Sequence, residues 1–142
     1  MFRRGLFLSI FISFLAGCDS GESRRIEETR TKLVGSWLEE VQDAQYRYRR
    51  IVALGADGKF TDRILSTRGA VTEGREFAGE WSYDGTNFKR RYLQENGRQY
   101  AGGTMRFTTF PLLSVGPSEL VVTDTMASQQ VTFRRVADGT QP

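Results

Sequence analysis

Cys18 is the only cysteine in the chain, and its chemistry is the most directly indicated by the sequence. It follows an N-terminal pair of arginines, an apolar segment over residues 6–15, and the small residues Ala16 and Gly17. A basic start, an apolar middle and small residues at the end are the three zones of a secretory signal peptide. A cysteine thiolate is a nucleophile, so a cysteine directly after such a signal is available for covalent modification. We therefore interpret residues 1–17 as a signal peptide, although a plain signal peptide would not need Cys18.

Leu15-Ala16-Gly17-Cys18 resembles the lipobox of bacterial lipoproteins. The resemblance implies that the thiol of Cys18 receives a diacylglyceryl group, that the signal is cut just before it, and that the new amine is acylated. Two or more acyl chains hold a protein stably on a membrane. The alternative, an anchor that spans the membrane, needs about 18 to 20 apolar residues, and this segment has about ten before Asp19. We expect a protein of the bacterial cell envelope, attached to a membrane through the lipid on Cys18.

Asp19 bears on the choice of membrane. In lipoproteins of enteric bacteria, an aspartate directly after the cysteine resembles a signal for retention in the inner membrane. The sequence thus favours the inner membrane, facing the periplasm, with the outer membrane as the alternative. If the organism does not use this rule, Asp19 is simply part of a polar linker.

The rest of the composition excludes several functions. The chain has no histidine, which removes the Ser-His-Asp and Cys-His catalytic systems and the usual zinc sites. The formal net charge of +3 includes the two arginines of the signal peptide, so the mature protein is nearly neutral and nucleic acid is not an expected partner. We expect one non-enzymatic domain with no cofactor and no metal.

Residues 18–32 are polar, highly charged and almost free of apolar side chains. A segment of this composition cannot form a core of its own. Ile26 and Leu33 are seven residues apart and could share one face of a helix. We expect a lipid-anchored tether that begins flexible and ends in a short helix.

From residue 33 onward, apolar and polar residues alternate with period two, which is typical of β-strands with one buried face. Asp57-Gly58, Asp84-Gly85 and Asn96-Gly97 supply the positive φ angles of tight hairpin turns. We expect a loop over residues 67–74, and we expect Pro111 to end the sixth strand. The strands are expected over residues 33–38, 45–54, 59–66, 77–83, 86–94, 98–110, 119–125 and 129–136.

A meander of this length protects its strand edges best by closing on itself. We therefore predict an all-β fold, an antiparallel up-and-down meander of about eight strands that closes into a barrel over residues 33–136. The runner-up is a β-sandwich, which the same alternation permits. Residues 137–142 are expected to form a disordered tail.

Four short motifs follow one another along this region: Leu33-x-Gly35-x-Trp37, Asp57-Gly58-Lys59-Phe60, Gly79-x-Trp81 and Val131-x-Phe133-x-Arg135. Their order and spacing resemble the short lipocalin-like domains found in many bacterial proteins, over roughly residues 32–136. In that family, the tryptophan of the first strand packs across the closed end of the barrel, and an arginine near the last strand lies against it. The resemblance implies these structural roles for Trp37 and for Arg135 or Arg134, through a cation–π contact.

Alternation also points several aromatic side chains and two arginines, Arg50 and Arg90, toward the barrel interior. A buried arginine has to meet a carboxylate, water at the barrel mouth or an anionic ligand, and Asp62 and Asp124 are the candidate carboxylates. We hypothesise a site for a small amphipathic or apolar ligand, such as a fatty acid. The alternative is a barrel filled by its own side chains. The candidate ligand-binding residues are Tyr48, Arg50, Phe60, Trp81, Arg90 and Tyr92.

A second hypothesis concerns the outer surface, where a basic stripe could comprise Lys89, Arg90, Arg91, Arg47, Arg49, Arg106 and Arg134. Such a stripe would suit anionic lipid head groups or an acidic envelope protein. The alternative is a solvated wall balanced by Glu76 and Glu80. The sequence therefore predicts a non-enzymatic binding module of the cell envelope. The alternative function is an interaction or assembly protein with a filled barrel and a functional outer surface.

Overall fold

The computed structural model describes residues 19–101 and 106–142. The expected signal peptide and Cys18 lie outside the described residues, so processing and lipidation stay predictions. In the part described, one helix precedes nine strands. These elements are α1 (Asp19–Leu33), β1 (Gly35–Gln42), β2 (Tyr46–Leu54), β3 (Lys59–Arg68), β4 (Val71–Tyr83), β5 (Asn87–Glu95), β6 (Arg98–Gln99), β7 (Arg106–Val115), β8 (Glu119–Asp124) and β9 (Gln129–Val136).

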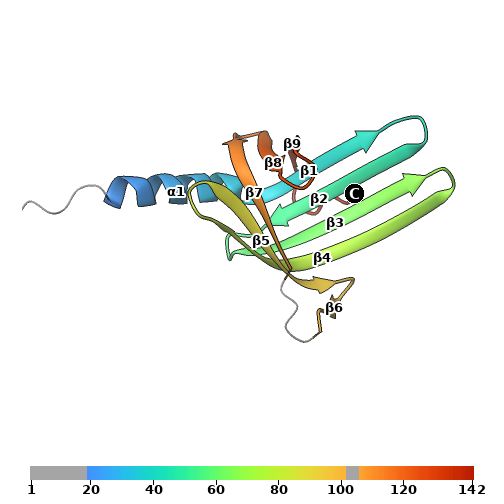
Figure 1. The fold of residues 1–142 in the computed structure, drawn as a ribbon, viewed down its shortest axis with the longest axis horizontal. Coiled ribbons are helices and arrows are strands. Elements are labelled where there is room, and N and C mark those ends of the chain that lie inside the picture. Colours follow the sequence, from blue (N-terminus) through green and yellow to red (C-terminus); the bar gives the residue numbers. More distant parts are fainter. Residues whose placement is uncertain (1–18, 102–105) are drawn as a thin grey trace, which may run out of the picture.

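Eight of these strands form one closed antiparallel sheet. Around the ring they follow the order β1, β2, β3, β4, β5, β7, β8 and β9, and β9 pairs with β1 again. The short strand β6 adds to β5 outside the ring. Figure 1 shows β1 to β4 as one long, curved wall. The prediction of a lipocalin-like up-and-down barrel is therefore confirmed, and the runner-up sandwich is excluded.

The ring closes where β4 meets β5, and a glycine makes the close approach possible. The pairing register shifts between Ala78 and Gly79. A Cβ atom at Gly79 would collide with the backbone oxygen of Arg91 and would lie 3.0 Å from the ring of Phe60. A bulge of this kind bends and twists a strand, so it lets β4 turn into the curve of the barrel.

The prediction of a loop over residues 67–74 is wrong. The pairing of β3 with β4 continues to Arg68 opposite Val71, and Gly69 turns the chain with a φ of 58°. The β4 side chains from Val71 to Glu76 are all exposed. No buried face therefore imposes the alternation by which a strand is identified in a sequence.

Pro111 lies inside β7, whereas we expected it to end a strand. It pairs with Asn87, the first residue of β5, and the pairing of β7 with β8 begins at Leu112. The pairing of β7 with β5 thus ends at Pro111, and its pairing with β8 begins one residue later. Pro111 has no N–H group to donate, and at this position neither pairing requires one.

Helix α1 covers the whole segment from residue 19 to residue 33, whereas we expected a helix only at its end. Its last turns lie against the closed end of the barrel. Arg30 lies over the ring of Trp81, 5.2 Å from its centroid, and donates a hydrogen bond to the carbonyl of Ala56 at 3.0 Å. The first turns project away from the barrel (Figure 1). Among the described residues, no helix combines the length and apolar character needed to cross a membrane.

The closed end of the barrel is built around Trp37, which is fully buried and donates from Nε1 to the carbonyl of Leu33 at 2.8 Å. The guanidinium of Arg135 lies 4.1 Å from the centroid of the Trp37 ring. Arg135 also donates to the carbonyls of Lys32, Val34 and Pro117 at 2.7, 2.9 and 2.7 Å. The contact between Arg135 and Trp37 is the one that the lipocalin-like resemblance implies, and the hydrogen bonds of Arg135 join the end of α1 to the barrel.

Residues 137–142, for which we expected disorder, fold back on the outer wall. Ser36 on β1 donates to the carboxylate of Asp138 at 2.8 Å, and Arg63 on β3 donates to the side chain of Gln141 at 3.3 Å. The tail thereby crosses β2, where the outward-facing Ile51 is only 4% exposed. Apolar surface on the outside of the barrel explains why the tail lies there.

Candidate ligand site inside the barrel

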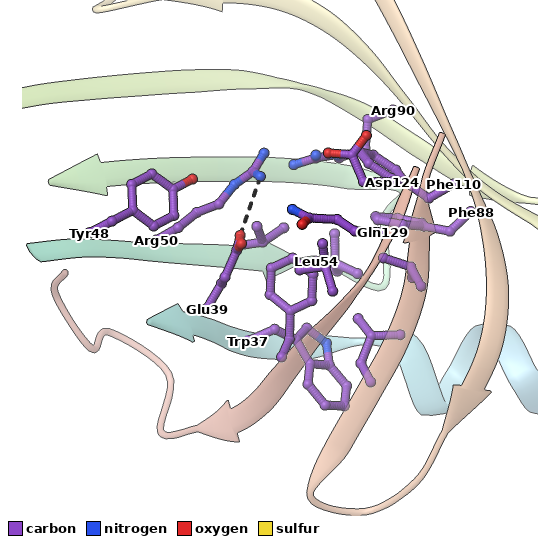
Figure 2. A pocket seen from close by; sticks show the side chains of 15 residues that line it. Trp37, Glu39, Tyr48, Arg50, Leu54, Phe88, Arg90, Phe110, Asp124 and Gln129 are labelled. Atoms are coloured by element: carbon purple, nitrogen blue, oxygen red, sulfur yellow. Dashed lines mark ion pairs between the residues drawn. The ribbon is translucent and has the colours of Figure 1, made fainter. Parts of the chain in front are cut away.

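A cavity of about 130 Å³ lies inside the barrel. Its apolar walls are formed by Trp37, Val52, Leu54, Phe88, Phe110, Leu120, Val122, Val131 and Phe133. Its polar walls are formed by Glu39, Tyr48, Arg50, Arg90, Asp124 and Gln129. Figure 2 shows Glu39, Arg50 and Gln129 pointing toward one another at one side of the cavity, with Trp37 and Leu54 at the other. The figure also places Arg90 and Asp124 beside Phe88 and Phe110, so charged and apolar side chains alternate around the cavity wall.

Strand alternation accounts for the inward position of these side chains. On β1, Trp37 and Glu39 are two residues apart and share the inner face. The register of β1 with β2 places Glu39 opposite Arg50, and Arg50 Nη1 lies 3.6 Å from Glu39 Oε2. Directly opposite residues of unlike charge attract each other across an antiparallel pair.

Asp62 joins the two inward-facing arginines. It is 0% exposed and accepts from Arg50 Nε at 2.9 Å, from Arg50 Nη2 at 2.5 Å and from Arg90 Nη1 at 2.6 Å. Burial alone would raise the pKa of the Asp62 carboxyl, but the hydrogen bonds and charges of the two arginines outweigh burial and hold that pKa below its usual value. Asp62 is therefore a buried anion that two cations share.

Arg90 is enclosed by aromatic rings. Its side chain is 2% exposed, and its guanidinium carbon lies between 5.0 and 5.8 Å from the centroids of four rings, which belong to Phe60, Phe88, Tyr92 and Phe110. Cations are attracted to the faces of aromatic rings, and more strongly when water is excluded. These rings and Asp62 together make the burial of Arg90 tolerable.

Two buried polar atoms on the walls of the cavity have no hydrogen-bond partner within the described residues. They are Oε2 of Glu39, which is an acceptor, and Nε of Arg90, which is a donor. Burial raises the pKa of the Glu39 carboxyl above its usual value, although Arg50 opposes this shift. Burial also raises the pKa of the neighbouring Tyr48 to about 12, so its hydroxyl stays protonated at neutral pH.

The structure brings three of the six candidate ligand-binding residues to the cavity, namely Tyr48, Arg50 and Arg90. The other three support the walls. Phe60 and Tyr92 pack edge to face with their centroids 5.2 Å apart, and Trp81 donates to the carbonyl of Gly55 at 2.9 Å.

Sequence reasoning missed Glu39 and Gln129 as cavity residues. Glu39 has the same parity as Trp37 and lies two residues further along β1, so extending the first strand would have found it. Gln129, the first residue of β9, is exposed to solvent, but it lies two residues before Val131, shares its face and lines the cavity.

The volume of the cavity limits what it can hold. Pockets for drug-sized ligands measure about 300 to 1,000 Å³, whereas an engineered cavity of about 150 Å³ holds benzene. A cavity of about 130 Å³ therefore suits a molecule about the size of one substituted ring. A volume of about 130 Å³ is too small to enclose the whole chain of a fatty acid.

The basic stripe expected on the outer surface is interrupted. Arg90 lies inside the barrel, Lys89 pairs with Asp84 at 2.6 Å, and Arg91 pairs with Glu80. Arg106 lies 3.8 Å from Glu95. The remaining three stripe arginines, Arg47, Arg49 and Arg134, all lie within 3.1 to 3.6 Å of the single carboxylate of Glu40. Within the stripe, this last group is the one with an excess of positive charge.

The described residues contain no group of three or more Cys, Asp or Glu side chains that could hold a metal ion. The barrel and its cavity are therefore the features that bear on function. No protein-family model and no curated protein matches this chain.

Proposed function

We propose that this protein is a lipid-anchored binding protein of the bacterial cell envelope, whose barrel takes up a small ligand without converting it. The observation that carries this proposal is the cavity of about 130 Å³, whose walls combine a few charged side chains with many apolar ones. Ligand sites are typically concave and largely apolar, with a few polar groups that fix the orientation of the ligand.

The chemistry of the cavity favours binding over catalysis. The Asp62 carboxylate accepts three hydrogen bonds from two arginines, which leaves it no freedom to act as a base. Glu39 lies beside Arg50, and the chain offers no histidine to relay a proton.

The anchor rests on the lipobox resemblance and on the position of α1. The helix begins directly after Cys18 and has 15 residues, which corresponds to about 22 Å. Its far end is held to the closed end of the barrel by Arg30 and Arg135. A lipid on Cys18 would therefore place the closed end toward the membrane, and the helix would act as a stalk.

Lipid attachment is tested by labelling cells with radioactive palmitate and by detergent phase separation. The wild-type chain should incorporate label and enter the detergent phase. Cys18→Ser should do neither, and Ser20→Ala serves as the matched control. An unlabelled wild-type chain, or a labelled Cys18→Ser chain, would refute the anchor.

Ligand binding is tested by ligand-observed NMR with a library of fragments of fewer than about ten non-hydrogen atoms. The lipidated protein in detergent micelles is compared with Val131→Phe, which fills the cavity from a half-buried position on β9. Fragments that bind wild type and lose their signal with the variant support the proposal. A library without any such fragment would eliminate the binding function.

One observation favours a second candidate, an envelope interaction protein that uses its outer surface. Arg47, Arg49 and Arg134 gather around Glu40 with an excess of positive charge. Such a group attracts anionic surfaces at low salt. Co-sedimentation of the protein, made without its lipid, with vesicles rich in anionic lipid should then fall steeply as salt rises. Absence of binding at low salt would rule this surface out.

A further inference from the structure

We infer that the cavity selects a small, electrically neutral molecule that has a hydrogen-bond donor and an acceptor at one end and an apolar ring at the other, as in an aromatic primary amide. This inference rests on the proposed function, that the cavity takes up a ligand. It differs from the amphipathic acid expected from the sequence in both the size and the charge of the ligand.

The size follows from the volume of about 130 Å³ and from the shape of the apolar wall. Trp37, Phe88 and Phe133 are buried and line the cavity, so an aromatic body packed against them would lose its contact with water. The polar end of such a ligand would then face Glu39 and Arg90.

We infer that the ligand is electrically neutral from the charges that surround the cavity. Arg50 and Arg90 contribute two positive charges, and Asp62 and Glu39 contribute two negative charges. An added charge would have no buried counterion, and burying an unpaired charge is costly. Asp124 also lines the cavity, but it is partly exposed to water and its Oδ1 already accepts from the backbone N–H groups of Met126 and Ala127 at 2.9 and 3.1 Å, so we leave its charge out of this balance.

The requirement for both a donor and an acceptor follows from the two unsatisfied atoms. Oε2 of Glu39 has only the ion-pair contact with Arg50 at 3.6 Å and is free to accept a hydrogen bond, and Nε of Arg90 is free to donate one. A buried polar atom without a partner costs free energy, so a ligand that supplies either group gains affinity. A primary amide carries both groups without any charge.

The position of Gln129 agrees with this choice. Its side chain ends in a neutral carboxamide, lines the same cavity and points toward Glu39 and Arg50 in Figure 2. The polar side of the cavity thus already accommodates the functional group that we assign to the ligand.

The test uses three ring compounds of nearly equal size and shape, namely benzamide (neutral), benzoate (negative) and benzamidine (positive). Each is titrated into the lipidated protein in micelles, and the dissociation constant is measured by NMR. Val131→Phe in the same micelles corrects for partition into detergent. We expect benzamide to bind at least tenfold more tightly than either charged compound and to lose its affinity in Val131→Phe.

Substitution of Glu39 provides a second measurement. Glu39→Gln removes one negative charge and leaves the cluster with an excess of positive charge. We expect the preference for benzamide over benzoate to shrink at least fivefold, whereas Glu76→Gln on the outer wall should leave it unchanged.

Several outcomes would overturn the inference. Equal or tighter binding of benzoate or benzamidine contradicts the selection for a neutral ligand while leaving a binding function in place. Binding that persists in Val131→Phe places the site elsewhere. If none of the three compounds binds although library fragments do, the ligand class is wrong. If library fragments do not bind either, the proposed function fails with it.

Discussion

Substituting Asp62 with asparagine removes the one buried carboxylate that two arginines share. Asp62 is completely inaccessible, and its three hydrogen bonds from Arg50 and Arg90 measure 2.5 to 2.9 Å. The asparagine side chain would offer one acceptor oxygen to the same donors and would turn an amide N–H toward a guanidinium. Among the described residues, Arg50 would then keep only its ion pair with Glu39 at 3.6 Å, and Arg90 would keep none.

The expected loss is large because breaking a buried ion pair on one side costs about 3 to 5 kcal/mol. A domain of this kind has only about 5 to 15 kcal/mol of stability in total. The melting temperature should therefore fall by roughly 10 to 20 °C. The wild-type contribution of Asp62 should persist at every pH above its ordinary pKa of 3.8 and disappear as the pH falls through the lower pKa of the folded state.

Urea unfolding followed by tryptophan fluorescence measures this loss, because Trp37 and Trp81 are both buried. Glu76→Gln is the matched control, since Glu76 pairs with Arg63 at 2.9 Å on the exposed wall and should contribute less than about 1 kcal/mol. If Asp62→Asn cost no more than this control, the view of Asp62 as the necessary counterion of the interior would be wrong.

Three further predictions concern the barrel and its ends. Arg135→Ala should lower the free energy of unfolding by about 2 to 4 kcal/mol, because three hydrogen bonds to backbone carbonyls and the contact with Trp37 are lost. Hydrogen exchange in α1 should also accelerate, and unchanged exchange would contradict the role of Arg135 in holding α1. Gly79→Ala should lower the free energy of unfolding, measured in urea, by about 3 kcal/mol or more. Gly74→Ala on the same strand, where a Cβ atom meets nothing closer than 3.9 Å, should change it by less than about 0.5 kcal/mol, and equal effects would refute the close approach at Gly79. Burial raises the pKa of Glu39, so the folded state binds this proton more tightly than the unfolded chain; the resulting stability is complete below about pH 4.5 and is lost as the pH rises through the folded pKa. Glu39→Gln should therefore unfold at higher urea than wild type at pH 7 and at similar urea below pH 4, and a variant that is less stable at pH 7 would contradict this.

The barrel was predictable because its strands are buried on one face. Period-two alternation placed Arg50 and Arg90 inside and identified Asp62 as a candidate partner, and the structure agrees on all three. Where both faces of a strand are exposed, as from Val71 to Glu76, alternation carries no information and the strand was missed.

The cavity residue Glu39 was missed for a different reason. A glutamate followed by a second glutamate is typical of the polar end of a strand, and only the partner across the sheet, Arg50, makes an inward carboxylate stable. The alternation of apolar and polar residues does not determine the volume of the cavity. It depends on how Trp37, Phe88 and Phe133 pack against one another across the barrel, which a one-dimensional pattern does not contain.

The most direct test is the signal of the arginine Nε–H groups in a ¹H–¹⁵N NMR spectrum, recorded with and without saturating benzamide. Arg90 Nε is buried without a partner among the described residues, so its resonance should shift when an amide oxygen enters the cavity, while that of Arg63 on the outer wall should not. Arg90→Lys assigns the signal by its loss. A shift of the Arg90 signal with an unchanged Arg63 signal is the predicted result, and an Arg90 signal that does not move at saturation would contradict a ligand site inside this barrel.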